Sequence, residues 1–306
     1  MIINDAEIED DLKQHGYQVV RLIASSSVAK HFEVSNAKGF TFDVKVYNHA
    51  AASNIIDYYN NEKDILGTLI HPNIVETFDF FQTQNYSYLV FELCRDLSLE
   101  SIVSSTRKCS EKNVYVYLSQ LIQGIEYLHS NNIVHNNLNP STIHFDRFGR
   151  IKIVDFDYAS ISYKQNSDRC PHSRYSFSPE TYSGKPYDPR ASDVWSFGAI
   201  SYYLLSGQYP WSNNSEISYS DSLESSMKNL YGKYDEKLIQ LILDCLSEDP
   251  SKRPLASVAN SFFMYTEKQY PISKKFIRKQ NSNQSISKIK RNSSSPQFRA
   301  CSSLYK

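Results

Sequence analysis

IVHNNLNPSTIHFDRFGRIKIVDFD, residues 133–157, is the most informative stretch of this 306-residue chain. It begins with a polar loop, residues 135–142, and a short apolar strand follows at residues 143–145. A turn then leads to a second strand with apolar residues, at 151–154. Asp155 ends this strand, so the hairpin brings an acidic side chain close to the polar loop.

This stretch resembles the catalytic core of eukaryotic protein kinases. In that family a His-Arg-Asp-Leu-Lys-Pro-x-Asn loop supplies the catalytic base, and an Asp-Phe-Gly turn holds magnesium. The framework of both motifs is present in this chain, as His135, Leu138, Pro140, Asp155 and Phe156. Most of the groups that carry the chemistry differ.

The differences fall on the residues that transfer the phosphoryl group. Asn137 stands in place of the catalytic aspartate, Asn139 in place of the lysine and Thr142 in place of the metal-binding asparagine. A carboxamide cannot accept the proton of a substrate hydroxyl, a step worth roughly 10²–10⁴ in rate. Asn139 also places no positive charge beside the phosphoryl group. Asp155 is retained as a magnesium ligand, and Asp157, which replaces the glycine, is a possible further oxygen ligand.

The segment that would cover the phosphates of a nucleotide departs from the family as well. Ala24, Ser26 and Ala29 take the positions of three glycines whose backbone amides close over the phosphates. Each side chain restricts the backbone and pushes it away from a bound phosphate. We therefore expect a strand hairpin without a tight phosphate clamp.

The expected adenine pocket is polar and narrow. Asp43 replaces a small alanine, His31 the valine above the base and His144 the apolar residue below it. Desolvating an unpaired carboxylate against a neutral base costs on the order of several kcal/mol. Alternatively, Asp43 turns to solvent or pairs with either histidine, and a paired set would still fill the slot. Phe91, at the gatekeeper position, narrows the pocket further, so we expect no cofactor unless residual binding of ATP and magnesium survives.

Residues that brace the two lobes in the family are retained. Lys45 matches the strand lysine that contacts the α- and β-phosphates, and Glu62, on a helix expected within residues 51–69, is its usual partner. We expect this ion pair, either as a sign of an active-like helix position or as bracing alone. The resemblance also assigns the hinge residues Glu92 and Cys94, a buried pair of Glu180 with Arg253, and Asp193 beneath the loop.

The strongest match is GKPYDPRASDVWSFGAISYYLLSGQYPW, residues 184–211, which is similar to the calcium/calmodulin-dependent and AMP-activated serine/threonine kinases. The resemblance implies an α+β, bilobal fold with a small lobe of antiparallel sheet plus one helix and a larger, mainly helical lobe. The expected parts are a polar lead-in (1–16), the kinase-like domain (17–265, with lobes 17–93 and 94–265) and a tail (266–306).

The tail is basic and rich in Ser and Asn. From Pro271 onward it has nine Lys or Arg residues and no Asp or Glu, although the net charge of the chain is zero. Such a composition cannot offset the entropy of ordering, so it predicts disorder. An acidic partner, an anionic membrane, a nucleic acid or no dedicated partner are the alternatives.

The cellular setting follows from what the sequence contains. No run approaches the roughly 20 apolar residues of a membrane helix, and the acidic start does not resemble a signal peptide. The five cysteines form no Cys-x-x-Cys pair, which is typical of reduced thiols. We expect a cytoplasmic protein, with the nucleus as the alternative, and no transmembrane segment.

Three functions are compatible with these features. The first is a pseudokinase that acts as a binding, scaffold or allosteric module and contacts other signalling proteins, such as an active kinase or its substrate. The second is a low-activity serine/threonine kinase that uses ATP and magnesium. The third is an unrelated or tail-driven nucleic-acid-binding protein, for which the folded part has no basic surface interleaved with aromatic residues. The joint loss of base, lysine, metal ligand and phosphate loop favours the first.

Overall fold

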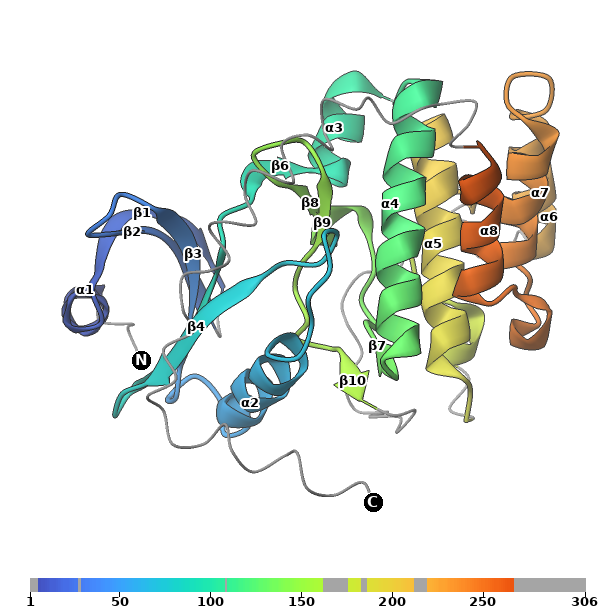
Figure 1. Ribbon diagram of the computed structural model, residues 1–306. Helices are drawn as coiled ribbons and strands as arrows, with labels where there is room; N and C mark the ends of the chain where they lie inside the picture. The colour runs from blue at the N-terminus through green and yellow to red at the C-terminus, as the bar shows by residue number, and fades with distance from the viewer. Residues whose placement is uncertain are drawn as a thin grey trace, which may run out of the picture. The chain divides into compact units, whose positions relative to one another are not determined.

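The computed structural model has a sheet-rich N-terminal part and a mainly helical C-terminal part (Figure 1), so the predicted α+β class is confirmed. It describes residues 5–26, 29–107, 109–161, 176–182, 186–211 and 219–266. The predicted tail lies outside the described residues, apart from the end of the last helix. Among the described helices, none is long and apolar enough to cross a membrane.

A five-stranded antiparallel sheet forms the N-terminal part, in the order β1-β2-β3-β5-β4. β5 lies between β3 and β4, and nearly every residue of this Val-, Leu- and Tyr-containing strand is buried, as expected for a strand covered on both faces. The strand bounds are β1 (Tyr17–Ser25), β2 (Ala29–Asn36), β3 (Thr41–Asn48), β4 (Thr77–Gln82) and β5 (Tyr86–Glu92).

A helix that the sequence analysis did not predict covers one face of this sheet. α1 (Asp5–Gln14) lies within the segment expected to be a polar lead-in, and that expectation is wrong for these residues. Ile8 and Leu12, one turn apart, are fully buried among apolar residues of the sheet. Asp11 accepts hydrogen bonds from the Tyr88 hydroxyl (2.7 Å) and the Thr83 hydroxyl (2.8 Å). Only two apolar residues face the sheet, so the amphipathic pattern is too weak to recognise in isolation.

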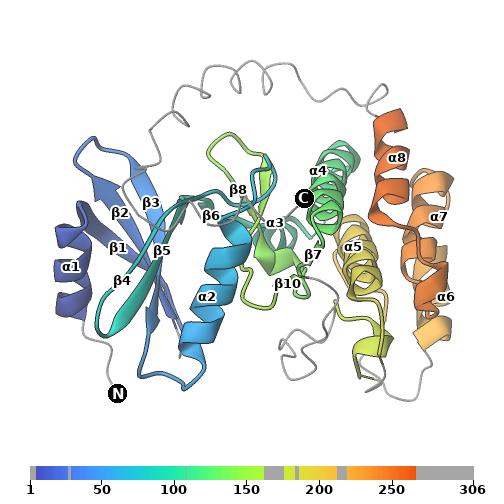
Figure 2. The same cartoon turned by 60° about the horizontal axis from the view of Figure 1, so that its bottom comes forward.

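α2 (Ile55–Leu66) covers the opposite face of the sheet (Figure 2). It falls within the range predicted for a helix and is shorter at both ends. Ile55, Tyr59, Glu62 and Ile65 are buried, and their spacing of three or four residues places them on one face. This face directs a carboxylate toward β3.

Two long helices form the centre of the C-terminal part, α4 (Glu111–Ser130) and α5 (Pro189–Ser206). Side-chain caps from Ser110 and Asp188 begin them, and Gly207 in a left-handed conformation ends α5. The other helices are α3 (Leu99–Thr106), α6 (Tyr219–Lys228), α7 (Glu236–Cys245) and α8 (Ala256–Thr266).

The hairpin predicted from the opening stretch is present between the two parts of the chain. β8 (Ile143–Phe145) and β9 (Ile151–Ile153) pair antiparallel, and β6 (Arg95–Ser98) adds to β8. Gly124 on α4 allows close packing here, since an added Cβ would lie 2.7 Å from Ile153 Cδ1. Before and after the hairpin, β7 (Ile133–Val134) pairs with β10 (Ser160–Ile161).

His71 joins the N-terminal part to α4. Its ring stacks on Tyr127 of α4 with the centroids 4.9 Å apart, and its Nδ1 accepts the backbone N–H of Asn73 at 3.1 Å. Partial burial, and to a lesser degree the charge of Lys152, lower the pKa of His71 to about 4. The imidazole is therefore neutral near pH 7, which keeps Nδ1 available as an acceptor.

We expect His71 to make the fold sensitive to acid. A histidine in the unfolded chain has a pKa of about 6.5. Between pH 6.5 and pH 4, His71 is therefore mostly protonated in the unfolded state and mostly neutral in the folded state. The stabilising contribution is complete above pH 6.5 and decreases as the pH falls toward 4. Linkage gives a loss of about 2 kcal/mol between pH 7.5 and pH 5. Urea unfolding at these two pH values should show a smaller loss in His71→Gln, and an equal loss would contradict this account.

Candidate functional site

Lys45 on β3 lies at the centre of a cluster of carboxylates. Its side chain is 5% exposed, and its Nζ lies 3.1 Å from Glu62 Oε2, so the predicted ion pair is present. The same Nζ lies 2.5 Å from Asp157 Oδ1 and 3.7 Å from Asp155 Oδ1. The lysine is thus surrounded by three carboxylates, of which the sequence analysis anticipated one as an ion-pair partner.

Tyr47 is a member of this cluster that the sequence analysis missed. It is two residues beyond Lys45 on β3, and alternate residues of a strand point to the same face. Its buried hydroxyl donates to Asp157 Oδ1 at 2.7 Å and also contacts Glu62. Strand alternation beside a predicted lysine was the signal that could have identified it.

The charges in this cluster support one another. Burial alone would lower the pKa of Lys45, but Asp157 and Glu62 outweigh it and raise that pKa well above its usual value. Burial likewise opposes ionisation of Asp157, yet Lys45 holds its pKa well below the usual range. Lys45 is therefore protonated and Asp157 ionised at neutral pH. Asp155 keeps 40% of its side-chain surface exposed, and partial burial together with Asp157 raises its pKa to about 7.

The second oxygen of Glu62 ties α2 to the turn after β9. It accepts the backbone N–H of Phe156 at 3.3 Å, and the buried Phe156 ring and the His135 ring form a T-shaped contact with their centroids 4.8 Å apart. One residue earlier on α2, the Asn61 amide donates to the carbonyl of Ala159 at 2.8 Å. These bonds determine the position of α2 relative to residues 155–159.

Asp193 on α5 supports the polar loop, as the resemblance implies. Its buried carboxylate accepts the backbone N–H of His135 at 2.9 Å and that of Asn136 at 3.0 Å, and it contacts His129 Nε2 at 3.0 Å. Asn136 has a φ of +61°, a left-handed conformation that asparagine tolerates better than most residues. The loop backbone is thus held in place despite the substitutions in its sequence.

The side chains of Asn137, Asn139 and Thr142 form hydrogen bonds within the loop. The Asn139 side chain accepts the backbone N–H of Ser141 at 2.9 Å and donates to the carbonyl of Asn137 at 2.9 Å. The Thr142 hydroxyl accepts the backbone N–H of Asn139 at 3.1 Å and donates to its carbonyl at 3.0 Å. All three side chains belong to buried residues. They stabilise the turn Pro140–Thr142, and the Thr142 hydroxyl is committed to that turn.

On the adenine side of the predicted site, Asp43 has a partner. Its Oδ1 lies 3.0 Å from His31 Nδ1, so the paired alternative holds for His31. His144 does not join them, because its Nε2 lies 3.0 Å from the carbonyl oxygen of Ser141. The buried Phe91 is directly opposite Asp43 on the neighbouring strand. Two of the three polar substitutions therefore meet, and the third bonds to the loop.

The two hinge residues have different environments. The Glu92 carboxylate accepts the backbone N–H of Glu76 at 3.0 Å and forms an ion pair with the buried Lys152. Burial, with Glu92 as a lesser cause, raises the pKa of Cys94 above its usual range. Cys94 is therefore a neutral thiol, and a reactive thiolate is not expected at this position.

At the positions where the family has the glycines of the phosphate loop, hydrogen bonds between Ser26 and Ala29 close the β1–β2 hairpin. The Ser26 hydroxyl donates to the carbonyl of Ala29 at 3.0 Å and accepts its backbone N–H at 3.1 Å. Ala24 is paired across the strands with His31. Residues 27–28 lie outside the described residues. The strand hairpin that we expect is thus present on both sides of this gap.

The predicted brace of the C-terminal part is also present. Arg253 donates to both carboxylate oxygens of Glu180, at 2.5 and 2.8 Å, and its side chain is 0% exposed. The guanidinium lies 4.7 Å from the centroid of the Trp195 ring. Most of the segment corresponding to the activation loop, residues 162–175, lies outside the described residues.

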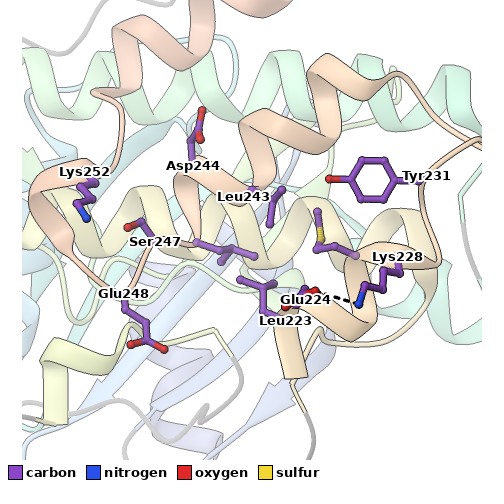
Figure 3. A pocket seen from close by; sticks show the side chains of 11 residues that line it. Leu223, Glu224, Lys228, Tyr231, Leu243, Asp244, Ser247, Glu248 and Lys252 are labelled. Atoms are coloured by element: carbon purple, nitrogen blue, oxygen red, sulfur yellow. Dashed lines mark ion pairs between the residues drawn. The ribbon is translucent and has the colours of Figure 1, made fainter. Parts of the chain in front are cut away.

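A pocket of about 550 Å³ lies elsewhere, between α6, the turn that follows it and the end of α7 (Figure 3). The exposed Glu224–Lys228 pair, 2.9 Å apart, is part of its wall. Its apolar and aromatic lining residues are Leu223, Met227, Tyr231, Leu243 and Leu246. None of its lining residues belongs to the predicted site, so this pocket and the lysine cluster are separate features.

Comparison with known proteins agrees with this arrangement. The family model described as protein kinase domain matches residues 17–263. The SNF1-related protein kinase catalytic subunit alpha KIN12 of Arabidopsis thaliana is 30% identical over 242 residues, 78% of this chain and 49% of that protein. Calcium-dependent protein kinase 6 of Plasmodium berghei is 31% identical over 206 residues, 65% of this chain and 14% of that protein.

A third relative, cAMP-dependent protein kinase type 3 of Saccharomyces cerevisiae, is 27% identical over 216 residues, 69% of this chain and 54% of that protein. The similarity to these serine/threonine kinases is distant, and the chain spans about half of their length or less. The family match covers the sheet, the lysine cluster, the loop and the Glu180–Arg253 brace. This chain belongs to the protein kinase domain family.

Proposed function

We propose that this chain is a pseudokinase, a catalytically deficient kinase domain that acts as a binding, scaffold or allosteric module in signalling. The observation that carries the proposal is Asn137 at the position of the catalytic aspartate. A carboxamide cannot take the proton of a substrate hydroxyl, which removes roughly 10²–10⁴ of the rate. Asn139 and Thr142 beside it form hydrogen bonds within the loop, and neither carries a charge that could stabilise a transferring phosphoryl group.

The residues present do not fit the magnesium–nucleotide group that the family implies. Thr142 offers a hydroxyl that is already bonded to the loop, where the family has an asparagine on the second metal. Asp157 is held by Lys45 and Tyr47. No group of three or more His, Cys, Asp or Glu side chains arranged for a metal occurs within the described ranges. Asp43, paired with His31, stands where a small apolar residue would meet the base.

The framework that a docking module needs is intact, which supports a role in binding. Asp193, the Glu180–Arg253 pair and the bonds of Glu62 hold the lobes and the loop without the transfer chemistry. The partners would be other signalling proteins, such as an active kinase or its substrate, and the basic tail would favour acidic ones. Free thiols at Cys94, Cys109 and Cys245 favour the cytoplasm or nucleus as the setting.

One observation favours a second function, a serine/threonine kinase of low activity. The Lys45–Glu62 pair is formed, and Asp155 presents an exposed carboxylate beside it. Two other relatives, from Saccharomyces cerevisiae and Xenopus laevis, are named serine/threonine-protein kinases, which supports protein serine and threonine as the acceptors in that case.

A phosphoryl-transfer assay separates the two functions. The purified full chain is incubated with radiolabelled ATP, magnesium or manganese, and a mixture of serine and threonine peptides. We expect transfer no greater than that of Lys45→Met, because the base is absent. Asn137→Asp alone should not restore an ordinary kinase rate, since Asn139 and Thr142 remain and such effects are not additive. Transfer by the parent chain that Lys45→Met abolishes would contradict the pseudokinase.

A further inference from the structure

We infer that Asp157 is a built-in competitor for the phosphate groups of a nucleotide, and that Tyr47 holds it in that position. The inference deepens the proposed function and rests on it, because it takes Lys45 as the counterpart of the lysine that contacts the nucleotide phosphates in active kinases. In this arrangement the anion that Lys45 binds is the Asp157 carboxylate of the same chain, so the lysine site is occupied without a nucleotide.

The distances around Lys45 Nζ show that carboxylates already occupy its surroundings. A lysine ammonium has three donors and no acceptor. One donor is used by Glu62 Oε2 at 3.1 Å and another by Asp157 Oδ1 at 2.5 Å, with Asp155 Oδ1 at 3.7 Å. A phosphate oxygen binds an ammonium at about 2.7–2.9 Å. Because Lys45 is almost fully buried and Asp157 occupies a contact of that kind, a phosphate oxygen would compete with Asp157 for the ammonium.

Tyr47 positions the competitor. Its hydroxyl and the Lys45 ammonium both meet the same oxygen of Asp157, Oδ1. The hydroxyl also contacts Glu62, so one side chain of β3 connects both carboxylates that hold the lysine. Without Tyr47, Asp157 would keep only one of these two bonds, and its carboxylate would be displaced more easily.

The charge balance of the cluster acts in the same direction. Lys45 faces three carboxylates, Glu62, Asp155 and Asp157, so the surroundings of the lysine are already rich in negative charge. Bringing a polyanionic phosphate chain beside them is opposed by like-charge repulsion. The same carboxylates order α2 and the turn after β9 through Glu62 and Phe156. The site is therefore held together without a ligand.

Equilibrium binding of nucleotide tests the inference. ATP binding to the full chain is measured by isothermal titration calorimetry, first with EDTA and then with magnesium, for the parent, Asp157→Asn and Tyr47→Phe. Asp157→Asn keeps the shape and removes the charge, so we expect roughly tenfold tighter binding or more, the effect of losing one charge-assisted competing bond. Tyr47→Phe should give a smaller gain, and the double variant should not exceed Asp157→Asn.

Two controls separate direct competition from other effects. Asp155→Asn, measured in EDTA and at a pH well above 7 so that Asp155 of the parent is ionised, removes a charge at 3.7 Å from Lys45 and breaks no hydrogen bond to it, so its gain should be smaller. Lys45→Met in the Asp157→Asn background should abolish the gain. If Asp157→Asn does not fold, Asp157→Gly, which restores the residue typical of the family, replaces it.

The outcomes are distinguishable from those of the transfer assay. Unchanged ATP affinity in folded Asp157→Asn and Asp157→Gly, or a gain equal to that of Asp155→Asn, would overturn the competitor role whatever the transfer result. Phosphoryl transfer by the parent chain would contradict the pseudokinase, while a gain on releasing Asp157 would still support the competitor.

Discussion

We expect Glu180→Ala to lower the free energy of unfolding by about 3–5 kcal/mol, because it leaves a buried guanidinium without its counter-ion. The Arg253 side chain is 0% exposed and makes a two-pronged contact with the Glu180 carboxylate. The carbonyls of Ser247 and Ala191 also accept from this guanidinium, but they carry no charge to balance it. Urea unfolding followed by tryptophan fluorescence is a suitable measurement, since Trp195 lies against Arg253.

The matched control is an ion pair of similar length at the surface. Glu224 and Lys228 are 2.9 Å apart, but their side chains are 71% and 69% exposed. Lys228→Ala should therefore change the unfolding free energy by less than about 1 kcal/mol. Similar losses in Glu180→Ala and Lys228→Ala would mean that the brace between Glu180 and Arg253 contributes no more than a solvated pair.

The second large effect is expected at the N-terminal helix. Leu12→Ala should cost about 2–5 kcal/mol, the range for emptying a well-packed leucine site, because Leu12 is 0% exposed between α1 and the sheet. Equilibrium urea unfolding of the full chain gives the value. If α1 were a passive extension, the loss would be far smaller.

Leu255→Ala is the control for this change. The same atoms are removed at a residue that is 61% exposed, just before α8, so little buried surface is lost. We expect the two substitutions to differ by at least about 1 kcal/mol. Equal effects would refute the assignment of α1 to the folded N-terminal part.

Local sequence was sufficient to predict the elements whose residues are close neighbours in the chain. The β8–β9 hairpin follows from a run of apolar residues on each side of a turn that Asp146 closes by accepting the N–H groups of Phe148 and Arg150. Helix α2 follows from residue spacing in the same way, and the antiparallel sheet follows from the family resemblance. The family motifs added pairs that no spacing could supply, such as Lys45 with Glu62 and Glu180 with Arg253.

α1 shows where this kind of prediction fails. DAEIEDDLKQ has only two large apolar residues among mostly charged ones, so by composition it resembles a solvated segment. The residues that make it a stable element belong to distant strands, because Ile8 and Leu12 complete a core that the sheet leaves open on that face.

By itself, the sequence determined that this chain is built as a kinase domain, and the resemblance assigns Asn137 to the position of the catalytic base, since both follow from residue identity within motifs. Only the tertiary structure decided what Asp157 does. It is 112 residues from Lys45 and 110 from Tyr47 in the chain, and its carboxylate meets both because β3 and the turn after β9 come together in the fold. Contacts at such separation leave no local pattern, so a residue considered as a possible metal ligand is the partner of a lysine.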